Sequence, residues 1–139
     1  MVSEVKSLTR LTLYRGWDSP GVYVWSPFVT KLEARFRIAG LAYQSESGSA
    51  LKAPKGKVPY VAITEKGTTR DPEKSLLYPD STLITDKLVE EGLLEDLNSK
   101  LSPTARAHDA GLRALLEEKL YFFQVSFLWS MLLYIYTHN

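Results

Sequence analysis

The chain of 139 residues contains no cysteine, and its only histidines are His108 and His138. The missing cysteine excludes disulfides, thiolate zinc sites and cysteine nucleophiles, although it does not identify the compartment. The two histidines are isolated and have no acidic partner at metal-ligand spacing, so we expect no metal site. Phosphate-loop, dinucleotide-binding and Ser-His-Asp signatures are also absent, and none of the corresponding activities is indicated.

Long runs of one charge are missing too, because the 17 basic and 16 acidic residues are interspersed along the chain. A nucleic-acid or acidic-polymer partner calls for a basic cluster, so we expect no nucleic acid among the partners. Residues 1–10 are polar and of mixed charge, so no signal peptide is visible and the expected location is cytoplasmic. The length allows one full domain and part of another.

The first part of the chain alternates strand and helix signals. Apolar and polar residues alternate from Leu8 to Tyr14, which indicates a strand, and the Asp-Ser-Pro-Gly cluster at 18–21 indicates a turn. The serine-proline pair at 26–27 is typical of a helix start. Apolar residues then recur at helical spacing as far as Gly40, so we predict a helix over 27–39.

Further strands and a second helix follow. A short strand is expected at 41–43, and residues 44–57 are rich in Ser, Gly, Lys and Pro, which indicates a loop. The segment 58–64 is rich in β-formers and predicts a strand, with a brief partner strand at 76–78. A helix is predicted over 82–94. The resulting order is βαβ followed by ββα, which predicts an α/β fold with a mixed sheet.

The last part of the chain predicts one long helix. Ser102-Pro103 repeats the helix-start signal, and residues 98–102 are expected to be a polar linker. Residues 120–136 are almost wholly apolar, at the short end of the ~17–25 residues that span a bilayer. Three interpretations of residues 125–139 stay open at this point: a buried core helix, a membrane anchor, or aberrant read-through of the gene.

Four short motifs, in this order, resemble the N-terminal domain of glutathione S-transferases. They are Leu13-Tyr14, Ser26-Pro27-Phe28, Gly56-Lys57-Val58-Pro59 and Asp80-Ser81. The residues that begin the first helix are most similar to the corresponding residues of the failed-axon-connections and metaxin-like branch of this family. The resemblance implies a thioredoxin-like βαβ-ββα N-terminal domain over residues 1–97. It also implies that residues 98–139 are a linker and the first long helix of a truncated α-helical glutathione-transferase C-terminal domain.

In this family the helix after the first strand points its N-terminus at the sulfur of glutathione. The resemblance therefore implies that Ser26 is the catalytic residue, with a hydroxyl that donates to the thiolate and lowers the thiol's pKa. The alternative is that Ser26 is only an N-cap whose oxygen is occupied by a backbone N–H. Tyr14 is a rival for the same role, but its place within a strand favours packing.

Five more residues are implied to bind the cofactor glutathione. Val58-Pro59 resembles the segment whose proline is cis in this fold, where the backbone of Val58 would pair with the cysteinyl part. Lys57 would meet a glutathione carboxylate, unless it is a solvated loop lysine. Asp80 would face the γ-glutamyl ammonium and Ser81 its carboxylate, although either residue also suits a plain N-cap.

Two functions are compatible with these residues. One is a glutathione transferase, a homodimer as transferases usually are, in which the bound thiolate attacks an electrophilic small molecule. The other is a non-catalytic, metaxin-like interaction module with a thioredoxin-like fold, associated with an organelle membrane through the apolar C-terminal stretch. Fold alone does not decide between them, so whether the chain is an enzyme stays open.

Overall fold

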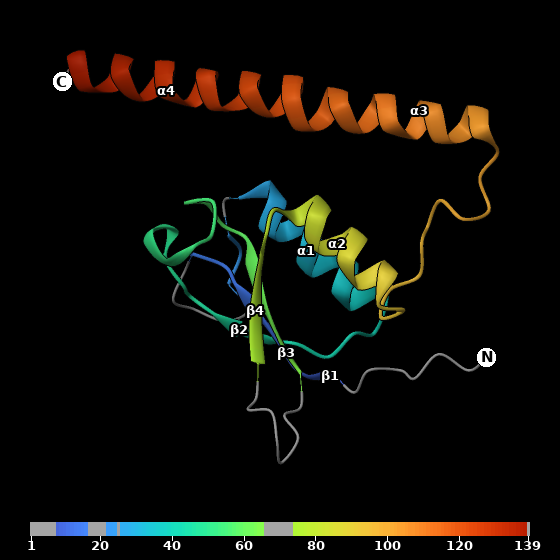
Figure 1. The fold of residues 1–139 in the computed structure, drawn as a ribbon. Helices are drawn as coiled ribbons and strands as arrows, with labels where there is room; N and C mark the ends of the chain where they lie inside the picture. The colour runs from blue at the N-terminus through green and yellow to red at the C-terminus, as the bar shows by residue number, and fades with distance from the viewer. Residues whose placement is uncertain (1–7, 17–21, 25, 66–73, 139) are drawn as a thin grey trace, which may run out of the picture. The chain divides into compact units, whose positions relative to one another are not determined.

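The computed structural model describes residues 8–16, 22–24, 26–65 and 74–138. The chain divides into two compact units, Met1–Asp96 and Leu97–Asn139. The first unit is mixed α/β and the second is helical (Figure 1). The turn predicted at 18–21 lies outside the described residues. The functional assignment of the predicted domains, 1–97 and 98–139, stays a prediction.

A four-stranded mixed sheet forms the first unit. Its strands are β1 (Leu8–Tyr14), β2 (Gln44–Glu46), β3 (Tyr60–Glu65) and β4 (Lys74–Pro79). Their order in the sheet is β2-β1-β3-β4, with β1 parallel to β2 and antiparallel to β3, and β4 antiparallel to β3. The parallel pair is joined through a helix, as parallel neighbours require. This topology confirms the predicted thioredoxin-like βαβ-ββα domain, followed by a helical domain.

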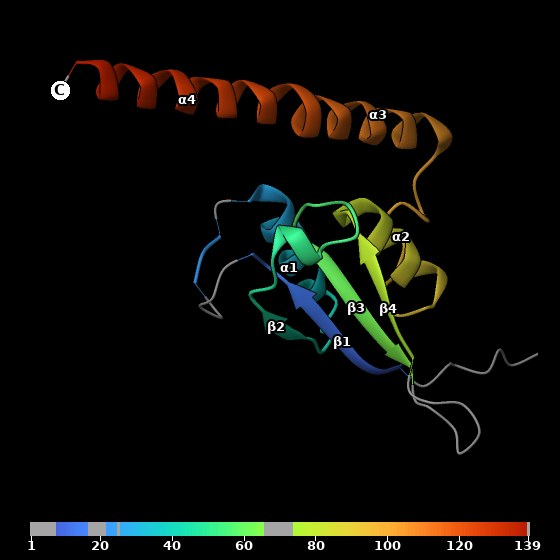
Figure 2. The same ribbon diagram turned by 60° about the vertical axis from the view of Figure 1, so that its left-hand side comes forward.

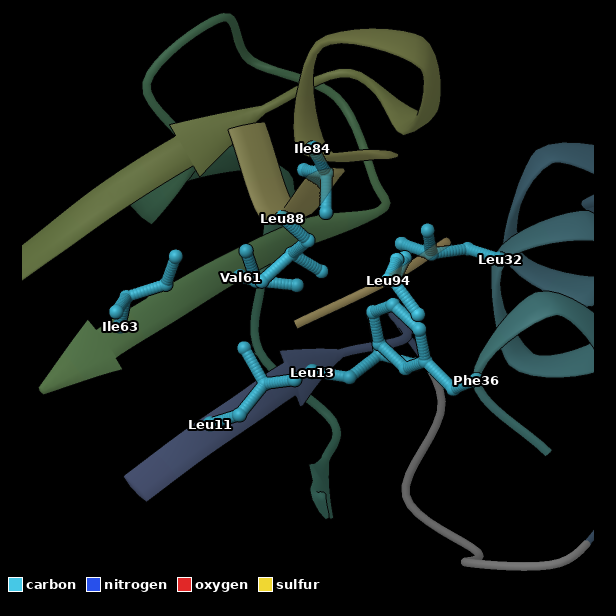
Figure 3. Close-up of a cluster of buried hydrophobic side chains, with 9 residues drawn as sticks. All are labelled: Leu11, Leu13, Leu32, Phe36, Val61, Ile63, Ile84, Leu88 and Leu94. Atoms are coloured by element: carbon cyan, nitrogen blue, oxygen red, sulfur yellow. The ribbon is translucent and has the colours of Figure 1, made fainter. Parts of the chain in front are cut away.

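The two helices of this unit, α1 (Pro27–Ile38) and α2 (Ser81–Glu90), pack on one face of the sheet and bury its apolar side chains. Alternate residues of β1 and β3 point toward them, as the period of two in a strand dictates. Figure 3 shows the resulting cluster. Its buried members are Leu11, Leu13, Leu32, Phe36, Val61, Ile63, Ile84, Leu88 and Leu94.

The helix predicted at 27–39 is found over Pro27–Ile38, and its end has a clear cause. Gly40 has a φ of +65°, a conformation that glycine adopts without steric cost. The backbone N–H of Leu41 then donates to the carbonyl of Phe36 at 2.9 Å, which closes the last turn. The strand predicted from Leu8 to Tyr14 is found with the same bounds.

The prediction of a strand at 41–43 was wrong, because β2 is Gln44–Glu46. Leu41 and Tyr43 instead pack against the core from the connection, and the Tyr43 ring meets the edge of Phe36 at a centroid distance of 5.2 Å. The strand itself pairs through its backbone with β1, and its side chains are polar. An edge strand of polar residues carries no hydrophobic pattern, so its composition resembled that of a loop.

The other boundaries also moved for local reasons. The strand predicted from 58 begins at Tyr60, since Pro59 lacks the N–H that a sheet ladder uses. β4 extends beyond the predicted 76–78 at both ends. α2 ends at Glu90 and not at 94, because Gly92 turns the chain with a φ of +71°. The N–H groups of Leu93 and Leu94 donate to the Leu88 carbonyl, which brings Leu94 into the core.

The second unit contains one continuous helix over Pro103–Thr137, which confirms the predicted long helix. It consists of α3 (Pro103–Ala114), a π-helical segment η2 (Leu115–Leu120) and α4 (Tyr121–Thr137). The hydroxyl of Ser102 caps it by accepting from the Ala105 N–H at 3.2 Å. By length and composition this helix is able to cross a membrane. The π-helical segment was not predicted.

Phe36→Ala is expected to lower the free energy of unfolding by about 3–5 kcal/mol, because the ring is fully buried in the cluster. The matched control is Ile38→Ala on the same helix, where the side chain is 77% exposed and the change should stay within ~0.5 kcal/mol. Urea unfolding of the full chain, followed by circular dichroism, measures both. Equal losses in the two variants would contradict this placement of the core.

Candidate functional site

The predicted site segments meet at one end of the sheet. In the strand register Tyr14 pairs with Tyr60, and Tyr60 pairs with Pro79. The residues just before Tyr60 and just after Pro79 are therefore neighbours at this end, which we call the site end. They are the predicted pairs Val58-Pro59 and Asp80-Ser81. The N-terminal ends of α1 and α2 lie at the same end of the sheet (Figures 1 and 2).

Gly16 brings the end of β1 close to the proline segment. Its φ is +77°, and a Cβ added there would lie only 3.0 Å from Cγ2 of Val58. A residue with a side chain would therefore be strained in its backbone and would displace Val58. The glycine fixes the distance between these two segments of the site end.

Ser26 is the N-cap of α1, but its side chain makes no capping hydrogen bond. Its backbone carbonyl accepts from the N–H of Thr30 at 3.2 Å and from the Thr30 hydroxyl at 3.3 Å. Among the described residues, its own hydroxyl has no hydrogen-bond partner. The alternative in which a backbone N–H occupies this oxygen is therefore not found. A free hydroxyl at a helix N-terminus is able to donate to an anion, and its catalytic role stays a prediction.

The peptide bond between Val58 and Pro59 is cis, as the resemblance implies. Val58 is half-buried and Pro59 is buried. Within the described ranges, neither the N–H nor the carbonyl of Val58 has a hydrogen-bond partner. Backbone groups of this kind are normally paired with protein, water or a ligand, so this residue offers one donor and one acceptor at the site end.

Asp80 caps α2, and its backbone is strained. Its Oδ1 accepts from the N–H groups of Thr82 at 2.9 Å and Leu83 at 3.4 Å. The residue has φ 70° and ψ 126°, and in the described part of the chain no other non-glycine residue has a positive φ. Such a conformation costs on the order of 1–3 kcal/mol and concentrates at functional sites. The N-cap alternative is thus realised at Asp80, while its second carboxylate oxygen makes no hydrogen bond or ion pair with a described residue.

Ser81 is nearly buried, with 4% of its surface exposed. Its carbonyl accepts from the Thr85 hydroxyl at 2.8 Å. Its own hydroxyl has no partner among the residues that the structure describes. It is the first residue of α2, where backbone N–H groups lack intrahelical acceptors. Hydroxyl and N–H together form a donor set that suits a carboxylate.

Lys57 is an exposed loop lysine that directly precedes Val58. Lys52 and Lys55 are exposed in the same loop, and no acidic residue lies between Ser47 and Pro59. In the described ranges Lys57 forms no ion pair. The loop thus carries positive charge beside the site end, and the contact of Lys57 with a carboxylate stays a prediction.

Arg15, which the sequence did not identify as a site residue, forms a buried ion pair next to the site end. It follows β1 and is only 2% exposed. Its guanidinium pairs with the Glu33 carboxylate of α1, with 2.7 Å between Nε and Oε1, and it also donates to the Val22 carbonyl. The pair ties β1, α1 and their connection together. A buried arginine carries no sequence signal here, because a charged residue after a strand resembles a solvated one.

Tyr14 takes the packing role that its strand position predicts. Its ring stacks on Tyr60 with 4.4 Å between centroids, and Gly48 packs closely against both rings. Burial, and then the nearby Glu46 carboxylate, raises the pKa of the Tyr14 phenol above its ordinary value.

The part of the chain that the structure describes holds no group of three His, Asp or Glu side chains that would bind a metal ion. The site end therefore offers backbone groups, two serine hydroxyls, one carboxylate and a lysine. These groups suit a small zwitterionic ligand that carries carboxylates and an ammonium.

Asp80→Ala is expected to destabilise the protein by about 1–2 kcal/mol, because it removes the hydrogen bonds of the cap while the strain at positive φ remains. Asp80→Gly also removes the cap but relieves the strain, so it should be at least ~1 kcal/mol more stable than the alanine variant. Urea unfolding measures both. An alanine variant as stable as the glycine variant would show that Asp80 is not strained.

The raised pKa of Tyr14 predicts a loss of stability at alkaline pH. The folded state favours the neutral phenol. The contribution of Tyr14 to the free energy of unfolding is therefore fully present below the unfolded pKa of ~10 and is lost as pH rises through the folded pKa. Tyr14→Phe keeps the stacked ring. Between about pH 9 and about pH 11.5, the free energy of unfolding of this variant should fall less than that of the wild type. Tyr136→Phe, in the helical unit, controls for the loss of one phenol. Identical pH profiles for wild type and Tyr14→Phe would contradict the prediction.

Comparison with known protein families identifies one match. Residues 27–134 match the family described as glutathione S-transferase N-terminal domain. The match runs from the start of α1 into α4, and it therefore extends past the stretch that resembled the family by its motifs. Neither the curated proteins nor the solved structures yielded a match.

Proposed function

The chain belongs to the glutathione S-transferase N-terminal domain family, and from that premise we propose that it binds glutathione at the site end of the sheet. The family supports the thioredoxin-like fold directly. The proposal extends this to a ligand, because polar groups that have no partner among the described residues lie where the family binds glutathione. The nearly buried Ser81, whose hydroxyl has no partner in the described chain, carries the proposal.

The start of α2 receives the γ-glutamyl end of the ligand in this proposal. The Ser81 hydroxyl and the Ser81 backbone N–H donate to the α-carboxylate, since the next N–H groups of the first turn already donate to Asp80, and the helix N-terminus favours its negative charge. The second oxygen of Asp80 accepts from the ammonium, while the first remains in the cap. The strained backbone of Asp80 is consistent with this role, because it fixes the position of the carboxylate, with one oxygen in the cap and the other toward the ligand.

The proline segment binds the middle of the ligand. The free N–H and carbonyl of Val58 pair with the cysteinyl backbone, as one strand pairs with another. Pro59 fixes the backbone of this segment. Lys57, which directly precedes Val58, provides a cation for the glycyl carboxylate. An exposed ion pair contributes only up to ~1 kcal/mol, so we expect Lys57 to contribute less than Ser81.

The start of α1 then faces the sulfur. Bound glutathione would supply the nucleophilic thiolate, which attacks an electrophilic small molecule. The Ser26 hydroxyl and the N-terminus of α1 stabilise its negative charge, so the thiol loses its proton to solvent at lower pH. The chain itself has no cysteine and contributes binding and electrostatics only. The choice of electrophile and homodimerisation belong to the same proposal.

Calorimetric titration of glutathione into the folded full chain tests binding. Ser81→Ala and Asp80→Gly should each weaken binding roughly tenfold or more, since each removes a hydrogen bond to a charged group. The matched control is Ser102→Ala, which removes an N-cap serine in the helical unit and should leave affinity unchanged. No binding, or equal affinity in all variants, would sink the proposal and leave the interaction module as the working function.

Ser26→Ala separates thiolate stabilisation from binding. At a pH well below the thiol pKa its affinity should match wild type, because the neutral thiol gains little from the hydroxyl. The pKa of bound glutathione, followed by thiolate ultraviolet absorbance, should rise in this variant. An unchanged pKa would assign Ser26 a purely structural role.

A further inference from the structure

The helix α4 has no polar face. Its polar side chains in the interior are Gln124, Ser126 and Ser130. At 3.6 residues per turn, Gln124 lies on the other side of the helix from the two serines. No residue of α4 is buried in its unit, and large apolar side chains are exposed all round it, including Leu132 at 60% and Tyr134 at 64%. A helix that is apolar all round needs apolar surroundings on every side.

The length of this apolar stretch matches a bilayer. No charged residue lies between Leu120 and Thr137. The 17 residues of α4 span ~26 Å at 1.5 Å per residue. The hydrocarbon core of a typical bilayer is ~30 Å thick and that of a thin one ~27 Å, so a small adjustment suffices. Buried core helices of soluble domains usually have shorter apolar runs of about 10–14 residues.

The polar atoms of α4 are arranged as hydrocarbon surroundings require. The Ser130 hydroxyl donates to the Ser126 carbonyl at 2.9 Å, and the Thr137 hydroxyl donates to the Leu133 carbonyl at 3.0 Å. Such bonds within the helix satisfy hydroxyls without water. Tyrosines lie at both ends, Tyr121 at the first and Tyr134 and Tyr136 at the second, as in the aromatic belts of spanning helices.

We propose that α4 crosses a lipid bilayer as a membrane-spanning helix. Its N-terminal boundary lies at η2, where Glu117, Glu118 and Lys119 keep the chain at the interface. The π-helical turn coincides with this boundary, and water there can pair with the backbone groups that its altered hydrogen bonding leaves open. A second copy of the chain would cover only one side of α4, whereas lipid covers its whole circumference.

Tryptophan quenching in vesicles tests this arrangement. The full chain is synthesised in the presence of phosphatidylcholine vesicles whose acyl chains carry bromine either near their ends or near the headgroups. Trp129 lies near the middle of α4, so deep bromines should quench its fluorescence more strongly than shallow ones. Trp129→Phe should remove this difference, because the other tryptophans, Trp17 and Trp25, precede α1.

Flotation with the vesicles provides the matched comparison. Leu128→Arg places a charge near the helix centre and should lower the ratio of inserted to free chain about a hundredfold. Leu112→Arg makes the same change in α3, outside the apolar stretch, and should leave that ratio unchanged. Quenching by shallow bromines only, or insertion of Leu128→Arg equal to wild type, overturns the proposal.

Discussion

The pairing of β3 with both β1 and β4 is the interaction on which the first unit depends. Through this register the inward side chains of β1 and β3, such as Leu13 and Val61, join the core under α1 and α2. On the other face the same pairing stacks Tyr14 on Tyr60. It also sets Tyr60 opposite Pro79, so the segment before β3 and the segment after β4 must meet. One ladder thus builds the core and assembles the site end.

The site end differs from the rest of the unit in how its polar groups are satisfied. Next to it, Arg15 and Glu33 form a buried ion pair that links the end of β1 to α1. At the site end itself, the hydroxyls of Ser26 and Ser81 and the backbone of Val58 have no partner in the described chain. Native proteins pair most such groups, so these open groups next to a strained Asp80 are the basis of the proposed ligand site.

Local chemistry made much of this fold readable from the sequence. Serine followed by proline marked the starts of α1 and α3, and the alternation in β1 gave its bounds. The order of the four short motifs, through their resemblance to the family, predicted the site residues and the cis proline. Features that depend on tertiary contacts were not readable: the polar edge strand β2, the burial of Arg15, the strain at Asp80 and the π-helical turn. Each is determined by neighbours distant in sequence or by backbone geometry that no residue type specifies.

The two units present different surfaces to their surroundings. The α/β unit buries its apolar side chains and offers polar groups at one end, whereas the helical unit exposes an uncharged apolar helix. A protein that binds a soluble thiol peptide while held at a bilayer would need both. Neither property follows from the fold class, and each depends on named residues in its own unit.

The most direct test of the central claim, that one end of the sheet forms a single ligand site, is amide mapping by nuclear magnetic resonance with added glutathione. The account predicts shifts for Val58, Ser81 and the first turn of α1 together, with one common saturation curve. Amides at the far end of the ladder, such as Ile63 and Leu76, should not move. Shifts confined to the far end, scattered along the chain or absent from Val58 and Ser81 would contradict it.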